Sequence, residues 1–289
     1  MQRRGLKSLS SNPAEEGVLV KEPERSGWKT IRISGSGEEI LYEKITPEFP
    51  VTIILDGQEF ATIVCSPSEL ENLTIGFLAS EGVIRTYNEI KSLQIDGYKG
   101  YVYIHLKKPV IAERLDHSSR FIGSCCGKSR QFYFKSDART AKTITNKFTV
   151  STAACFKLMK ELMEGSEEFN QTGGVHNAAL ATAENLLITS TDIGRHNTLD
   201  KIFGTMLRDK ISARDKLIVF SGRISSEVLL KVSKMGIGFI ISKAALTDLA
   251  VELANDLGIT VIGFARNDRM NIYSHPERIS NLSIENKLG

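Results

Sequence analysis

Residues 216–266 read KLIVFSGRISSEVLLKVSKMGIGFIISKAALTDLAVELANDLGITVIGFAR, and they alternate short apolar runs with amphipathic segments. The apolar runs are typical of buried strands, and the amphipathic segments, each followed by a glycine, are typical of helices. The predicted strands cover 216–220, 237–241 and 259–264, and the predicted helices cover 225–235 and 247–257. Strands and helices that alternate in this way predict a largely parallel sheet covered by helices.

The same kind of pattern begins further upstream. Two apolar segments, 177–183 and 185–190, predict neighbouring strands, and helical spacing predicts helices over 149–165 and 197–207. We therefore expect residues 136–289 to form an α/β domain.

The N-terminal part of the chain has a different pattern. Asp56-Gly57 separates two apolar runs and predicts a β-hairpin, and Asp96-Gly97 predicts a second one. Between them, Ser66-Pro67-Ser68-Glu69 has the pattern of a capped helix start, with Ser66 as the N-cap. We expect a small α+β domain over 26–110, after a loose polar tail over 1–25 and before a connection over 111–135.

Composition describes an ordinary globular protein. The chain has 289 residues, 41% of them hydrophobic and 25% charged, with a formal net charge of +3. This charge is too small to indicate nucleic acid binding by itself, and no apolar run is long enough to cross a membrane. The four cysteines lack the paired spacing of a zinc ribbon, and no signal peptide is visible at the N-terminus. The cytoplasm is therefore the expected compartment, because it keeps thiols reduced.

Positive charges follow three successive predicted strands. They are Arg223, Lys243, Arg266 and Arg269, accompanied by Ser221, Gly222 and Ser242. Ligands of open α/β sheets bind at the carboxyl ends of strands, where helix N-termini add amide donors. One such cation would be ordinary surface charge, but four predict a binding site for phosphate or a nucleotide. Neither a Walker A sequence nor a Gly-x-Gly-x-x-Gly segment after a strand is present.

Two further segments are rich in polar side chains. One spans 172–177 and contains His176, and the other spans 191–197 and contains Arg195 and His196. Either segment alone would be read as a turn or a helix start. Two such segments in the same half of the chain predict a polar site.

The segment 123–130 carries Cys125 and Cys126 between two glycines, followed by Lys128. Glycine permits unusual backbone angles, so a loop is expected. Nearby cations raise the thiolate fraction, and the thiolate is the nucleophilic form of cysteine. The polar neighbours argue against burial, so we favour reactive thiols over inert ones, and both over half of a metal site.

Taken together, these motifs resemble those of the formate dehydrogenase accessory sulfurtransferase family (FdhD). The segments that carry the resemblance are 68–82, Cys126-Gly127-Lys128, 172–176, 192–197, 221–227, 263–266 and 273–278. The resemblance implies a cytidine-deaminase-like three-layer α/β/α domain with a smaller α+β N-terminal domain. It also implies a homodimer.

In function, the resemblance implies a sulfur carrier. Such a protein accepts persulfide sulfur from a cysteine desulfurase and transfers it to the molybdenum or tungsten bis-molybdopterin guanine dinucleotide cofactor, which then enters formate dehydrogenase. The residues implied to bind that cofactor are Phe264, Ala265, Arg266, Asn267, Asp268 and Arg269.

The cysteines depart from the family pattern. Many members have two cysteines separated by two residues before Gly-Lys, whereas Cys125 and Cys126 are adjacent. The sequence therefore leaves both cysteines as candidates for the residue that carries the persulfide. Zinc deaminase activity is rejected, because Ala178 stands where a His-x-Glu segment beginning at His176 would have its glutamate, and because the Pro-Cys-x-x-Cys segment is absent. A disulfide oxidoreductase is disfavoured because adjacent cysteines close a strained ring. A non-catalytic chaperone that binds the guanine nucleotide or the molybdenum cofactor remains the alternative.

Overall fold

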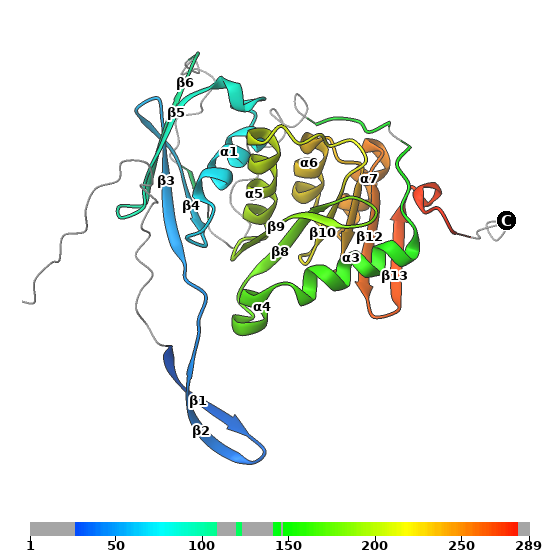
Figure 1. Cartoon of the computed structure of the whole chain (residues 1–289), viewed down its shortest axis with the longest axis horizontal. Helices are drawn as coiled ribbons and strands as arrows, with labels where there is room; N and C mark the ends of the chain where they lie inside the picture. Colours follow the sequence, from blue (N-terminus) through cyan, green and yellow to red (C-terminus); the bar gives the residue numbers. More distant parts are fainter. Residues whose placement is uncertain (1–26, 109–119, 123–140, 146, 283–289) are drawn as a thin grey trace, which may run out of the picture.

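The computed structural model describes residues 27–108, 120–122, 141–145 and 147–282, and the segments below lie within these ranges. They form a two-stranded, a five-stranded and a six-stranded sheet (Figure 1). The cysteine segment with Cys125, Cys126 and Lys128 lies outside the described residues, as does the tail over 1–25.

The six-stranded sheet is mixed, so the prediction of a largely parallel sheet was wrong. Its strands are β8 (His176–Ala181), β9 (Leu186–Asp192), β10 (Leu217–Phe220), β11 (Phe239–Ser242), β12 (Thr260–Arg266) and β13 (Arg269–Ser274), in the order β13-β12-β11-β10-β8-β9. Only β10–β11 and β11–β12 pair in parallel among them. The β8–β9 and β12–β13 connections are too short for a helical crossover, which leaves antiparallel pairing. Strand β13 was not predicted.

Helices cover both faces of this sheet, which confirms the three-layer α/β/α arrangement (Figure 1). Helix α3 (Thr152–Glu164) lies on one face, and the short helix α4 (Glu167–Thr172) follows it. Helices α5 (Arg195–Arg208), α6 (Ser226–Met235) and α7 (Asp248–Leu257) lie on the other. As predicted, α6 and α7 end at glycines in the left-handed conformation, Gly236 and Gly258.

The five-stranded sheet contains both predicted hairpins. Its strands are β3 (Phe49–Leu55), β4 (Gln58–Cys65), β5 (Ile90–Asp96), β6 (Tyr101–Leu106) and β7 (Arg120–Ile122), in the order β5-β6-β3-β4-β7. The β3–β4 and β5–β6 pairs are antiparallel and turn at Asp56-Gly57 and after Asp96. Strand β7 comes from the segment predicted as a connection, and it pairs in parallel with β4.

Helix α1 (Leu70–Ser80) begins later than predicted, and Ser66 is not its cap. Residue Glu69 takes the N-cap position in a left-handed conformation, with φ of 54°. The Ser66 hydroxyl instead accepts a hydrogen bond from the Ile193 backbone N–H at 3.2 Å, and its own N–H donates to Asp192 at 3.1 Å. The Ser66 hydroxyl, which the local pattern predicts to cap the helix, therefore binds the distant residue Ile193 instead.

Helices α1 and α5 join the two large sheets. A Cβ on Gly76 would lie 1.7 Å from the carbonyl oxygen of Asp200, and a Cβ on Gly204 would lie 1.9 Å from that of Asn72. The two glycines thus let the helix backbones touch, as small residues do at close helix crossings. One continuous apolar core runs from the five-stranded sheet through this helix pair to the six-stranded sheet.

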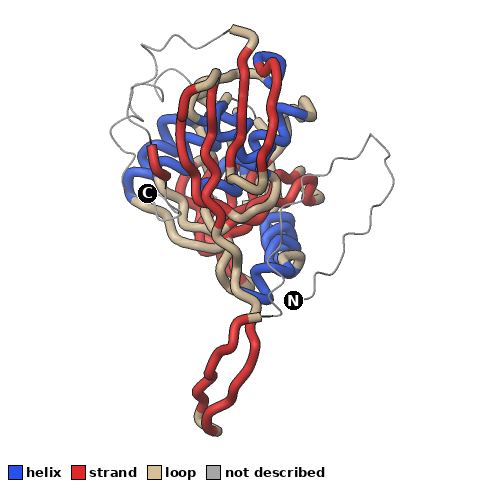
Figure 2. The backbone as a smooth tube through the Cα atoms, turned by 90° about the vertical axis from the view of Figure 1, so that its left-hand side faces the viewer, coloured by secondary structure: helices blue, strands red, loops and turns tan. Residues whose placement is uncertain are grey.

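The two-stranded sheet consists of β1 (Trp28–Ser34) and β2 (Gly37–Glu43) and projects from the body as an arm (Figure 2). Its base is attached to α4, where Thr46 donates to the hydroxyl of Thr172 at 2.7 Å. Two short 3-10 helices complete the described structure, η1 (Tyr87–Glu89) and η3 (Pro276–Arg278).

Candidate functional site

One edge of the six-stranded sheet gathers the polar segments predicted from the sequence. Strands β9, β10, β11 and β12 all end at this edge, and the antiparallel strand β8 begins there. His176 pairs directly with Asp192 across β8 and β9. We call this the cationic edge, and its charged members are Arg195, Arg223, Lys243, Arg266 and Arg269.

Backbone hydrogen bonds tie the loops of the cationic edge to one another. The Lys243 N–H donates to the Phe220 carbonyl at 3.1 Å, and the Phe264 N–H donates to the Ala244 carbonyl at 3.1 Å. The Ser221 hydroxyl accepts from the Asn177 N–H at 2.8 Å. The loops that carry the cations are therefore held in fixed relative positions.

Two helices present uncapped N-termini at this edge. Helix α5 begins after Gly194, which has no side chain to cap it, and the Ser225 side chain makes no capping hydrogen bond to α6. The Ser225 hydroxyl is buried and has no hydrogen-bond partner in the described structure. Free amide donors and the positive end of the helix dipole favour an anion at such a place.

Arg195, His176 and His196 lie close enough for their charges to interact. The charge of Arg195 lowers the pKa of both histidines, after burial, which is the larger cause in each case. Burial together with Lys231, Arg195 and His176 lowers the pKa of His196 to about 3, so this imidazole is neutral at physiological pH. The structure therefore brings together the two histidine segments, which the sequence alone could not place side by side.

The ring of His196 has an open hydrogen-bonding position. Its Nε2 lies 3.6 Å from Glu227 Oε2, beyond hydrogen-bond distance, and like the Nε of Arg195 it is buried without a partner in the described structure. Buried polar atoms without partners are uncommon in native proteins, and a catalytic role or a bound water or ion is among their explanations. A bound group could satisfy both nitrogens.

Two cations of the cationic edge, Lys243 and Arg266, lie near aromatic rings. The Lys243 ammonium lies 5.6 Å from the centre of the Phe169 ring, and the Arg266 guanidinium lies 6.0 Å from that of Phe264. Arg223 and the segment from Arg266 to Arg269 are exposed. These side chains are available to a ligand from solvent.

A buried carboxylate holds the loop that carries Arg195 and His196. Asp192 accepts hydrogen bonds from the Gly194 N–H, the Asn197 side chain and the Ser66 N–H, and it pairs with the Lys201 ammonium at 2.8 Å. Both charged side chains are fully buried. Since Ser66 follows β4, the smaller sheet helps to fix this side of the site.

The two described cysteines are not candidates for covalent chemistry. Cys65 and Cys155 are free and buried, and burial raises the pKa of each thiol to about 12. The described residues also contain no cluster of three or more metal-ligating side chains. None of the described helices is long and apolar enough to cross a membrane.

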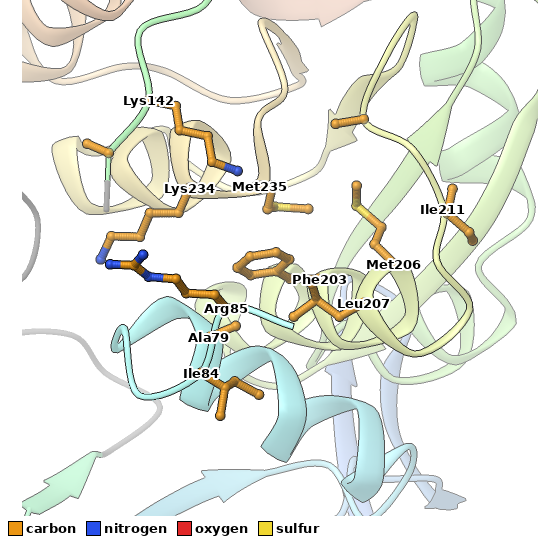
Figure 3. Close-up of a pocket in the computed structure, with 12 residues that line it drawn as sticks. Ala79, Ile84, Arg85, Lys142, Phe203, Met206, Leu207, Ile211, Lys234 and Met235 are labelled. Atoms are coloured by element: carbon orange, nitrogen blue, oxygen red, sulfur yellow. The ribbon is translucent and has the colours of Figure 1, made fainter. Parts of the chain in front are cut away.

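A separate cavity of about 450 Å3 lies between α1, α5 and α6, lined by side chains such as Phe203, Met206 and Met235 (Figure 3). These residues come from the C-terminal halves of α5 and α6, whereas the cationic edge lies at the N-terminal ends of both helices. The cavity is therefore not part of the candidate site.

Sequence reasoning missed Ser225, Glu227 and Phe169 as site residues. Ser225 and Glu227 stand at the start of the helix that follows β10. The rule that ligands bind at the carboxyl ends of strands could therefore have included them. Phe169 belongs to the six-residue helix α4, for which no pattern was recognised. Its place beside Lys243 depends on tertiary packing alone.

Comparisons with known proteins agree on one family. The FdhD/NarQ family model matches residues 46–280. A Bacillus subtilis protein named sulfur carrier protein FdhD is 55% identical over 237 residues, which are 82% of this chain and 90% of that protein. A Halalkalibacterium halodurans protein of the same name is 51% identical over 262 residues, which are 90% of this chain and 97% of that protein. A crystal structure described as a formate dehydrogenase accessory protein from Desulfotalea psychrophila superposes with a TM-score of 0.71, at 25% identity, and covers 87% of this chain and 97% of its own.

Proposed function

The chain belongs to the FdhD/NarQ family, and from that premise we propose that it is a sulfur carrier that serves formate dehydrogenase. In this proposal it acts in the cytoplasm as a homodimer and has sulfurtransferase activity. It receives persulfide sulfur from a cysteine desulfurase and delivers it to the bis-molybdopterin guanine dinucleotide cofactor of molybdenum or tungsten, which is its substrate. The names of the relatives support the sulfur-carrier role.

The sulfur-accepting group is Cys125 or Cys126. The cation of Lys128 favours the thiolate of a nearby cysteine. That thiolate attacks the terminal sulfur of the desulfurase persulfide, the sulfur–sulfur bond of the donor breaks, and the desulfurase leaves as a thiolate. A persulfide then remains on the carrier.

The cationic edge is the single observation that carries the substrate assignment. Arg195, Arg223, Lys243 and Arg266 surround two uncapped helix N-termini, an arrangement that suits the phosphates of a guanine dinucleotide. Phe264 offers a ring against which a base can stack. Neutral His196 can accept a hydrogen bond at Nε2 and is our candidate for holding a group near the reacting sulfur.

A non-catalytic chaperone for the cofactor is the second candidate, because such a protein would need only the cationic edge for binding and no reactive cysteine. Incubation with a cysteine desulfurase and cysteine, followed by intact-mass and peptide mass spectrometry, separates the two. A sulfur carrier gains one sulfur atom on the segment 123–130, and the Cys125→Ala/Cys126→Ala double variant loses both this adduct and cofactor sulfuration. Sulfur found only on Cys65 or Cys155, or sulfuration that survives the double substitution, would contradict the carrier.

A further inference from the structure

The cavity between α1, α5 and α6 has a lining of two kinds of side chain (Figure 3). Nine of its 12 lining residues are apolar, and the other three are Arg85, Lys142 and Lys234. No aspartate or glutamate is among the described residues that line it. The cavity therefore combines an apolar wall with positive charge and has no carboxylate of its own.

The three cations come from separate segments that meet at one end of the cavity. Arg85 lies in the loop between α1 and η1, Lys142 precedes α3, and Lys234 stands in the last turn of α6. Figure 3 shows these long side chains on one side of the cavity and Met206 and Ile211 on the other. The cavity thus has a cationic end and an apolar end.

Hydrogen bonds hold two of the cations in place. The Ser233 hydroxyl donates to the Lys142 carbonyl and accepts from the Lys142 N–H, both at 2.8 Å, which ties this residue to α6. A Cβ on Gly236 would lie 3.7 Å from the Lys142 Nζ, so the ammonium lies beside the end of the same helix. The buried Lys234 ammonium donates to the Ser80 carbonyl of α1 at 2.6 Å. The cationic end is therefore built on both helices.

Arg85 and Lys142 are open to a ligand from solvent. Both are exposed, and neither forms an ion pair with another residue of the described ranges. One exposed cation beside an apolar surface is ordinary, because long charged side chains often cover such a surface with their stems. Two of them at the same end of a cavity that no carboxylate lines favour an anion there.

We propose that this cavity binds a small amphiphilic anion, with its acidic headgroup beside Arg85 and Lys142 and its apolar body against Phe203, Met206 and Met235. The volume of about 450 Å3 is that of a small-molecule pocket. Methionine side chains adapt to apolar bodies of irregular shape. The lining surrounds the space from three helices, and such a concave site suits a small molecule better than the flat surface of a protein. The proposal does not depend on the sulfur-carrier function.

Titration calorimetry with decanoate tests the proposal, because decanoate joins a carboxylate to a linear apolar chain. We expect one decanoate per chain, and we expect acetate, which lacks the apolar body, to bind more than about a hundredfold more weakly. The Arg85→Gln/Lys142→Gln variant should bind decanoate about tenfold more weakly than the wild type. The matched control is Lys157→Gln/Lys160→Gln, which removes two exposed lysines of α3 and should leave the affinity unchanged. A wild type that does not bind decanoate, or a cavity variant that binds it as the wild type does, would overturn the proposal.

Nuclear magnetic resonance of the full chain with carbon-13 in its methionine methyl groups locates the bound decanoate. The signals of Met206 and Met235 should shift, and those of Met159 and Met163 should not, because α3 lies on the other face of the sheet (Figure 1). GDP should not displace decanoate, since the cationic edge lies at the opposite ends of α5 and α6. Unchanged Met206 and Met235 signals, or displacement of decanoate by GDP, would place the anion outside this cavity and contradict the proposal.

Discussion

At the scale of single residues, Arg266 is an exposed charge that a ligand from solvent can reach. It stands at the end of β12 beside Phe264, on the cationic edge. We predict that Arg266→Ala weakens GDP binding about tenfold or more, because a direct charge-assisted contact contributes roughly 1.5–3 kcal/mol. Titration calorimetry measures the effect, and Arg214→Ala, an arginine at the exposed turn before β10, is the control. Unchanged affinity in both Arg266→Ala and Arg269→Ala would remove this segment from the site.

His196 makes the stability of the protein depend on pH. Its pKa is about 3 in the folded chain and about 6.5 when unfolded, so the unfolded chain binds more protons between these values. The stabilising contribution is therefore fully present above pH 6.5 and is lost as the pH falls toward 3. His176, whose pKa burial also lowers, acts in the same direction.

Through His196, the wild type should lose about 2 kcal/mol of its free energy of unfolding between pH 7 and pH 5. We predict that this part of the loss is absent in His196→Gln. Urea unfolding at the two pH values gives this difference. Leu187→Gln, which replaces an exposed side chain of β9 and changes no titratable group, serves as the control and should keep the wild-type pH dependence. An unaltered pH dependence in His196→Gln would mean that the imidazole is not buried in its neutral form.

At the scale of elements, the contact between α1 and α5 depends on two glycines. We predict that Gly204→Ala destabilises the protein by roughly 3 kcal/mol, the upper end for overpacking, because its Cβ would overlap the Asn72 carbonyl of the facing helix. Urea unfolding measures the loss. Gly35→Ala is the matched control, since nothing lies within 4 Å of a Cβ there. A Gly204→Ala variant as stable as wild type would show that the helices can separate without cost.

The elements themselves were largely predictable, whereas their pairing directions were not. Periodicity and terminal glycines located α6 and α7, and Asp56-Gly57 located a hairpin. An apolar run such as β8, however, does not indicate whether the strand pairs in parallel or antiparallel with its neighbours. The mixed pairing of the sheet could therefore not be predicted. The strand-end rule did place Arg223, Lys243 and Arg266 on one edge, because it needs only the order of strands and loops.

At the scale of the whole molecule, two buried ion pairs of the α/β domain also hydrogen-bond to residues near the two ends of α1. Lys201 of α5 pairs with Asp192 and also donates to Ser68, which precedes α1. Lys231 of α6 pairs with Asp200, which accepts a further hydrogen bond from Ser80 at the end of α1. No local pattern could have predicted the hydrogen bonds to Ser68 and Ser80, because these residues lie 133 and 120 positions from their partners. They explain why the smaller sheet helps to hold the loop of Arg195 and His196.

We therefore predict that Lys201→Met destabilises the protein by about 3–5 kcal/mol, because it leaves the Asp192 carboxylate buried without its counter-ion. GDP affinity should also fall, because the loop of Arg195 and His196 loses its support, although the fully buried Lys201 side chain is closed to a ligand from solvent. Adding Asp192→Asn removes the unpaired charge, and the double variant should regain part of the lost stability. Lys157→Met, which removes an exposed ion pair with Glu161 and an exposed hydrogen bond to the Glu184 carbonyl, should cost no more than about 1 kcal/mol. Urea unfolding of the wild type and the three variants gives these differences, and a Lys201→Met variant no less stable than Lys157→Met would show that the buried pair does not stabilise the fold.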